Sequence, residues 1–93
     1  MESNVRARLL IAGRVQGVAF RFHARSRARQ LGLVGWTRNE PDGSVRLVAE
    51  GPRAALEALR DWTARGPDHA RVDRQEVGWG EAAGSFADFD IKG

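Results

Sequence analysis

The sequence contains no cysteine, and Lys92 is the only lysine among its 93 residues. A chain without cysteine forms no disulfide, offers no thiolate nucleophile and binds no zinc through sulfur. Histidine is scarce as well: His23 and His69 have no evident metal-ligand or catalytic partner near them in the sequence. The serines lie in no nucleophile-elbow pattern. We therefore expect no metal site and no nucleophilic serine or cysteine chemistry.

Long apolar runs are also missing. No stretch approaches the ~20 residues that cross a bilayer, and Met1 to Asn4 lack the charged and apolar pattern of a secretory leader. We expect a cytoplasmic protein without a membrane partner. The length leaves room for one small domain, residues 1–93, and its three tryptophans help to make a single core feasible without metal or disulfide staples.

The spacing of apolar residues predicts alternating strands and helices. Val5 to Ala12 alternates as a strand, and Phe20 to Leu31 repeats at helical spacing before a stop at Gly32. Strands are then expected at 34–39 and 45–49, joined by a turn at 39–43, followed by a helix with Pro52 as its first residue. The last two expected elements are a strand at about 70–79, with a bulge between Val72 and Val77, and a short strand near 89–91.

This order of elements, βαββαβ followed by one short strand, predicts the fold class. It is α+β: a ferredoxin-like α/β sandwich, with two helices packed on one face of a mainly antiparallel sheet and a short extra C-terminal strand. The residues expected in the core are Leu9, Ile11, Phe20, Trp36, Leu47, Leu56 and Trp62.

The connection between the first strand and the first helix has the pattern of an anion cradle. Two glycines allow a tight bend and a close approach of backbone N–H groups to a ligand, and Arg21 adds a permanently charged fork one turn into the helix. The pattern is neither a Walker A loop nor Gly-x-Gly-x-x-Gly. Taken alone, it is equally compatible with a structural turn beside an exposed arginine. The residues expected to form the cradle are Gly13, Arg14, Val15, Gln16, Gly17, Val18 and Ala19.

Asn39 is the second candidate residue. It ends the second predicted strand, which in this fold can lie beside the loop after the first strand. Its carboxamide can hold a water through both the carbonyl oxygen and the NH₂ group, but it does not titrate near neutral pH and so is no base. Spacing alone also permits a simple turn-capping asparagine. Asp42 and Gly43 have the composition of a structural turn.

Two sequence blocks together resemble the acylphosphatase family. They are Gly13 to Arg21 (GRVQGVAFR) and Gly35 to Val45 (GWTRNEPDGSV), followed by Glu50-Gly51. The resemblance implies an enzyme that hydrolyses the carboxyl–phosphate anhydride of acyl phosphates and releases inorganic phosphate. It gives Arg21 the role of binding phosphate, Asn39 that of positioning water, and implies no metal or cofactor. Ala19 stands where a larger residue is common in the family.

Two other interpretations compete with this one. An RNA-binding module can share the same element order, but segment 44–50 lacks the paired aromatics of RNA-recognition domains. The net charge of +3 is modest for a nucleic-acid binder, yet it helps to attract a small anion. An anion-binding regulatory module without turnover is the other alternative. We expect a free-standing monomeric enzyme with no nucleic-acid partner.

Overall fold

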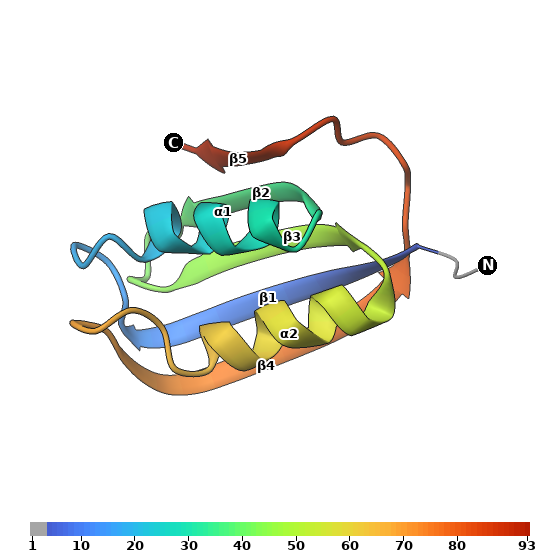
Figure 1. The fold of residues 1–93 in the computed structure, drawn as a ribbon. Helices are drawn as coiled ribbons and strands as arrows, with labels where there is room; N and C mark the ends of the chain where they lie inside the picture. The colour runs from blue at the N-terminus through green and yellow to red at the C-terminus, as the bar shows by residue number, and fades with distance from the viewer. Residues whose placement is uncertain (1–3) are drawn as a thin grey trace.

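The computed structural model describes residues 4–93. The first three residues, on which the expectation of no leader partly rests, lie outside this range. The described chain folds into five strands and two helices (Figure 1). They are β1 (Val5–Arg14), α1 (Phe20–Gln30), β2 (Val34–Asn39), β3 (Val45–Gly51), α2 (Arg53–Thr63), β4 (Arg71–Glu81) and β5 (Phe89–Lys92).

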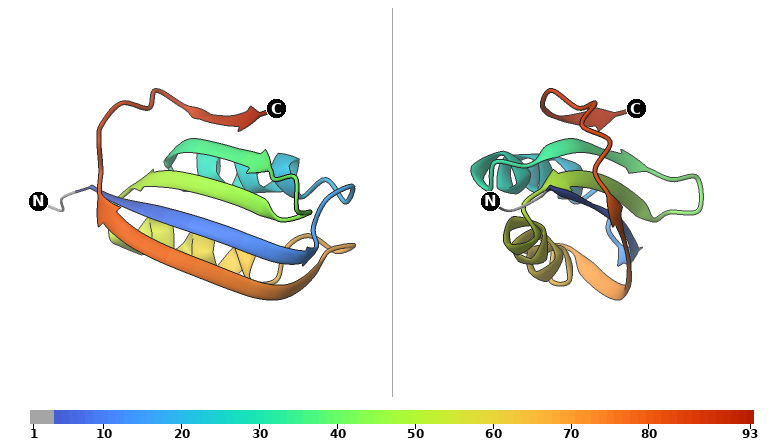
Figure 2. Two further views of the ribbon diagram at one scale, coloured as in Figure 1. Left: turned by 180° about the vertical axis from the view of Figure 1, so that it is seen from behind. Right: turned by 90° about the vertical axis from the view of Figure 1, so that its right-hand side faces the viewer.

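The strands form one sheet in the order β4-β1-β3-β2-β5. Strand β1 pairs antiparallel with both β3 and β4, and β2 pairs antiparallel with β3 and parallel with β5. Both helices cover the same face of the sheet, and the opposite face carries no helix from residues 4–93 (Figures 1 and 2). The predicted α+β ferredoxin-like sandwich and its short extra strand are therefore confirmed. No helix within residues 4–93 is long and apolar enough to cross a membrane.

The core lies between the sheet and the two helices. Five of the expected core residues are almost fully buried there, and Trp62 is half-buried against them, with its ring centroid 5.5 Å from that of Phe20. The apolar stripe of α2 thus packs as its spacing predicts. The five buried residues are Leu9, Ile11, Phe20, Leu47 and Leu56.

The expectation that Trp36 belongs to the core is wrong. Strand β2 directs Thr37 into the buried side, so Trp36, one residue earlier, faces the opposite side of the sheet, because successive side chains of a strand alternate. There its ring contacts two cations, the Arg38 guanidinium and the Lys92 ammonium, each 4.9 Å from the ring centroid. The position of a residue along the strand, and not the size of its side chain, decides which face of the sheet the side chain lies on.

The predicted bulge lies at the end of β4 that is next to the first loop. Ala12 is opposite Arg74 and Gly13 is opposite Val72, so Asp73 is the extra residue. At this point β4 approaches so closely that a Cβ on Gly13 would collide with the Arg71 carbonyl oxygen. A residue without a side chain is therefore required where β1 enters the loop. The second helix differs slightly from expectation: Pro52 is its N-cap, one position before the first helical residue.

Candidate active site

The loop from β1 to α1 turns through two residues with left-handed backbone conformations. Gly17 has φ +77°, and Ala19, the N-cap of α1, has φ +60° and ψ +26°. Glycine adopts this region freely, whereas alanine is strained there by about 1–2 kcal/mol. Backbone strain of this kind is concentrated at functional sites, where the surrounding structure maintains it.

The backbone N–H groups of this loop and of the first turn of α1 have no partners among the described residues. Within residues 4–93, no N–H from 15 to 22 has a hydrogen-bond acceptor. The first turn of α1 contains no acidic residue, and Ala19 provides no side-chain cap. Free N–H groups and the positive end of the helix dipole therefore meet in one place, as in anion sites at helix N-termini.

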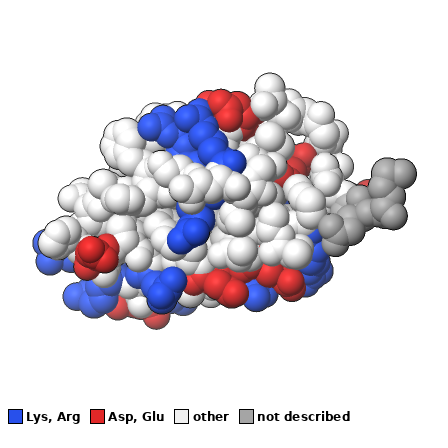
Figure 3. All heavy atoms as spheres, in the orientation of Figure 1, with Lys and Arg blue, Asp and Glu red and all other residues white. Residues whose placement is uncertain are grey.

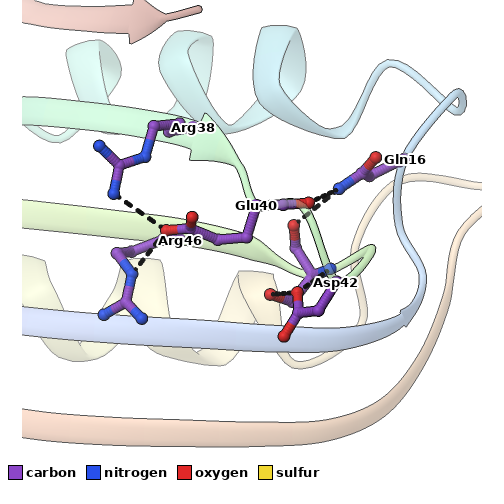
Figure 4. A network of polar contacts seen from close by, with 6 residues as sticks. Gln16, Arg38, Glu40, Asp42 and Arg46 are labelled. Carbon is purple, nitrogen blue, oxygen red and sulfur yellow. Dashed lines mark hydrogen bonds and ion pairs between the residues drawn. The ribbon is translucent and has the colours of Figure 1, made fainter.

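Two side chains fix the loop to the body of the protein. Val15 is buried in the core. Gln16 reaches the β2–β3 turn, where its Nε2 donates to the carbonyl oxygen of Glu40 at 2.8 Å and to that of Ser44 at 2.9 Å (Figure 4). Sequence reasoning assigned Gln16 only as part of the cradle and missed this link. No local signal could have revealed it, because the partners are 24 and 28 residues away.

A pocket of about 110 Å³ brings the two principal candidates together. Arg21, from the first turn of α1, and Asn39, from the end of β2, both line it. The remaining lining residues are Val15, Gly17, Ala19, Phe20 and Phe22. Three predicted loop residues thus reach this pocket. The other four do not: Gly13 lies beneath β4, Gln16 points to the turn, and Arg14 and Val18 line a larger groove on another side of the loop.

The two candidate side chains have few partners of their own. The Oδ1 atom of Asn39 is buried and accepts no hydrogen bond from any described residue. Such an atom is rare in a folded protein and marks a position where water or a ligand can complete the bonding. Half-buried Arg21 forms no ion pair within residues 4–93; its Nη1 donates only a long hydrogen bond, 3.4 Å, to the Lys92 carbonyl oxygen.

The turn that follows Asn39 is held by its own hydrogen bonds (Figure 4). Asp42 Oδ1 accepts from the Ser44 hydroxyl at 2.6 Å and from the Ser44 N–H at 2.9 Å, and these bonds lower the pKa of the Asp42 carboxyl. Glu40 accepts from Arg38 at 3.0 Å and from Arg46 at 2.8 Å, and these hydrogen bonds lower the pKa of its carboxyl. The turn is therefore rigid, and it presents Asn39 at a defined place.

One residue of the pocket escaped the sequence reasoning. Phe22 follows Arg21 directly and is 55% exposed, the single large apolar side chain so exposed among the described residues. The only sequence signal was its place off the apolar face of α1, which predicts exposure but no role. Among residues 4–93, no group of three or more His, Asp or Glu side chains is placed to hold a metal ion.

Fold and pocket together define a small ferredoxin-like α+β protein whose first strand–helix loop presents free backbone N–H groups beside a pocket lined by Arg21 and Asn39. The acylphosphatase family model matches residues 7–91. Acylphosphatases from Anaeromyxobacter dehalogenans and Salinibacter ruber are 51% and 53% identical, covering 99% and 98% of this chain and 99% and 94% of their own. The crystal structure of acylphosphatase from Bacillus subtilis superposes with a TM-score of 0.91 at 32% identity, over 95% of this chain and 98% of that one.

The chain belongs to the acylphosphatase family. It is accordingly an enzyme that acts on acyl phosphates, and the resemblance drawn from its two sequence blocks is confirmed. This family membership argues against the alternative of a module without turnover.

Proposed function

We propose that the loop Gly13–Ala19 and Arg21 bind the phosphoryl group of an acyl phosphate, and that Asn39 positions the attacking water. The buried, unpartnered Oδ1 of Asn39 is the observation that supports this assignment most directly. The residue Asn39 lines the same pocket as Arg21 and lies beside a loop with free N–H groups. A carboxamide oxygen that lacks a partner suits a water molecule, which donates one hydrogen bond to it and directs a lone pair at phosphorus.

The reaction needs little from the protein beyond placement and charge. The water oxygen forms a bond to phosphorus while the bond from phosphorus to the acyl oxygen breaks, which releases a carboxylate and inorganic phosphate. A carboxylate is a good leaving group, so no strong acid is required, and catalysis comes from positioning and electrostatic stabilisation. Because Asn39 does not titrate near neutral pH, one proton of the water passes to an oxygen of the phosphate itself.

We further propose that residues 1–93 act as one domain, as a monomer in the cytoplasm, without metal ion, cofactor, nucleic acid or membrane. The family model spans nearly the whole chain, which supports one domain. The groups assigned to neutralise the phosphate charge, Arg21 and the loop amides, belong to the chain itself. Sedimentation at several concentrations tests the monomer, and turnover in excess chelator tests the independence from metal.

The deciding experiment compares the wild-type enzyme with Asn39→Ala on benzoyl phosphate in excess chelator. Loss of a preorganised polar group near the reacting centre typically lowers the rate by ~10²–10³. We expect a fall in kcat of this order, with the competitive inhibition constant of inorganic phosphate changed less than about threefold. Arg8→Ala, which removes an exposed arginine on the other face of the sheet, is the control and should retain full activity. An equally large loss of phosphate binding in Asn39→Ala would contradict the role given to Asn39.

A further inference from the structure

A second and much larger depression lies on another side of the β1–α1 loop, which is proposed to bind phosphate. This groove has a volume of about 1040 Å³ and is bordered by the loop, by α1 and by the connection between α2 and β4. The two connections project side by side at the same end of the molecule (Figures 1 and 2). Gly17 and Ala19 line both this groove and the small pocket of Arg21 and Asn39. The groove therefore adjoins the proposed phosphate site, with the loop residues Gly17 and Ala19 between the two.

The wall formed by the α2–β4 connection is held by close packing. The Trp62 ring contacts that of Phe20, the first residue of α1. Gly66, with φ +72°, lies so close to Phe20 that an added Cβ would be 2.8 Å from the ring. The far wall of the groove is thus packed against the beginning of α1.

The charged side chains that line this groove are mostly arginines. Three arginines and two histidines line it, against a single carboxylate, Asp68. None of these six side chains forms an ion pair within residues 4–93, whereas eight arginines elsewhere in the same part of the chain do. Figure 3 shows Lys and Arg atoms on the helix side of the molecule, one group beside acidic atoms and a smaller group among uncharged atoms. The five basic residues are Arg14, His23, Arg27, Arg65 and His69.

We propose that this basic groove binds an anionic group on the acyl part of the substrate, so that the enzyme prefers acyl phosphates with a second negative charge. The inference rests on the proposed function, because it takes the phosphoryl group to lie in the neighbouring pocket. Unpaired arginines gain more from a carboxylate or phosphate than arginines that already have an acidic partner. Each exposed ion pair is weak, but several cations that face one groove act together on the same anion.

The test uses two substrates of equal length, succinyl phosphate and butyryl phosphate, which differ by a carboxylate in place of a methyl group. For the wild-type enzyme we expect kcat/KM for succinyl phosphate to be about three- to tenfold higher at low ionic strength, and the preference to shrink as salt is added. The double variant Arg27→Gln/Arg65→Gln should bring the ratio close to one while leaving butyryl phosphate turnover within about twofold. Arg8→Gln removes one arginine from the opposite face, without an ion pair among residues 4–93, and should keep the preference.

Three results would overturn the proposal. The first is a wild-type enzyme whose kcat/KM is nearly the same for succinyl phosphate and butyryl phosphate. The second is an equal loss for both substrates in the double variant, which would make the groove part of general phosphate binding. The third is a pair of results: the two substrates have similar kcat/KM, and free succinate changes the turnover of butyryl phosphate only when Arg27 and Arg65 are present. That pair would make the groove a site for a separate anion. The roles of Arg21 and Asn39 are judged separately, from butyryl phosphate turnover in their own variants.

Discussion

The side-chain amide of Gln16 donates to the backbone carbonyl of Glu40 at 2.8 Å, and so joins the β1–α1 loop to the turn that follows Asn39. The same nitrogen also donates to the Ser44 carbonyl at 2.9 Å. One side chain thereby fixes the separation between the loop that is proposed to hold phosphate and the strand end that is proposed to hold water.

Replacing Gln16 tests this link. Gln16→Ala removes one of two donors from the carbonyl oxygens of Glu40 and Ser44, each of which keeps a backbone N–H partner, so we expect a loss of about 1 kcal/mol in the free energy of unfolding, measured with urea. We also expect a drop in kcat, because Asn39 and the loop are no longer held in register. Gln30→Ala, at an exposed position near the end of α1, is the matched control and should be neutral. Unchanged kcat in a destabilised Gln16→Ala would show that the link is structural only.

Arg21 should be needed for both binding and turnover. Removal of a charged donor at the phosphoryl group predicts a fall in kcat/KM of at least ~10²–10³ for Arg21→Ala, with weaker inhibition by inorganic phosphate. Arg21→Lys should recover little of this loss, because a lysine ammonium lacks the planar fork that binds two oxygens. Steady-state kinetics and phosphate inhibition of the three proteins provide the measurement. Full activity of the lysine variant would reduce the role of Arg21 to that of a simple positive charge.

The backbone of Ala19 allows a test of strain in the loop. Ala19→Gly removes the cost of a left-handed alanine but adds flexibility to the unfolded chain, so we expect a stability that is unchanged or higher by up to about 1 kcal/mol. Gly17→Val should have the opposite effect and lower both stability and phosphate affinity, because a β-branched residue resists φ +77°. Urea unfolding together with phosphate titration checks both variants. A fully active and stable Gly17→Val would show that the loop does not depend on this conformation.

Glu50 provides a prediction about pH. Its carboxyl is almost completely buried. Burial raises its pKa, but the N–H groups of Ala83 and Gly84 and the side chain of Arg6 outweigh this effect, and the net pKa is below 4.5. A group whose pKa is lower in the folded state than in the unfolded state contributes stability above about pH 4.5 and loses it as the pH falls through the folded-state pKa.

The comparison of wild type with Glu50→Gln isolates this contribution. We expect the variant to be less stable by about 1–3 kcal/mol at pH 7, and the difference to shrink as the pH falls below 4.5. Urea unfolding at a series of pH values measures it. Glu81→Gln, at an exposed carboxylate without an ion pair among the described residues, is the control and should show a small difference at every pH. A Glu50 difference that stays constant down to pH 3 would argue against the lowered pKa.

The local features of this protein could be predicted from its sequence because each depends on neighbouring residues. Alternation from Val5 to Ala12 indicated β1, and helical spacing from Phe20 to Leu31 indicated α1. The opposite parity of Val72 and Val77 indicated a bulge, and the structure has it. The two sequence blocks indicated the family for the same reason, since each is a continuous run of residues.

What depends on the packing of distant segments could be decided only by the tertiary structure. The sequence determined that Arg21 lies near the start of a helix and that Asn39 ends a strand, but not that both line one pocket, nor that Oδ1 of Asn39 is buried without a partner among the described residues. The hydrogen bonds from Gln16 to the β2–β3 turn and the face of the sheet on which Trp36 lies are also features that only the tertiary structure decided. The physical reason is that local conformation follows from nearby residues, whereas contacts across the fold depend on strand order and register, which only the assembled sheet sets.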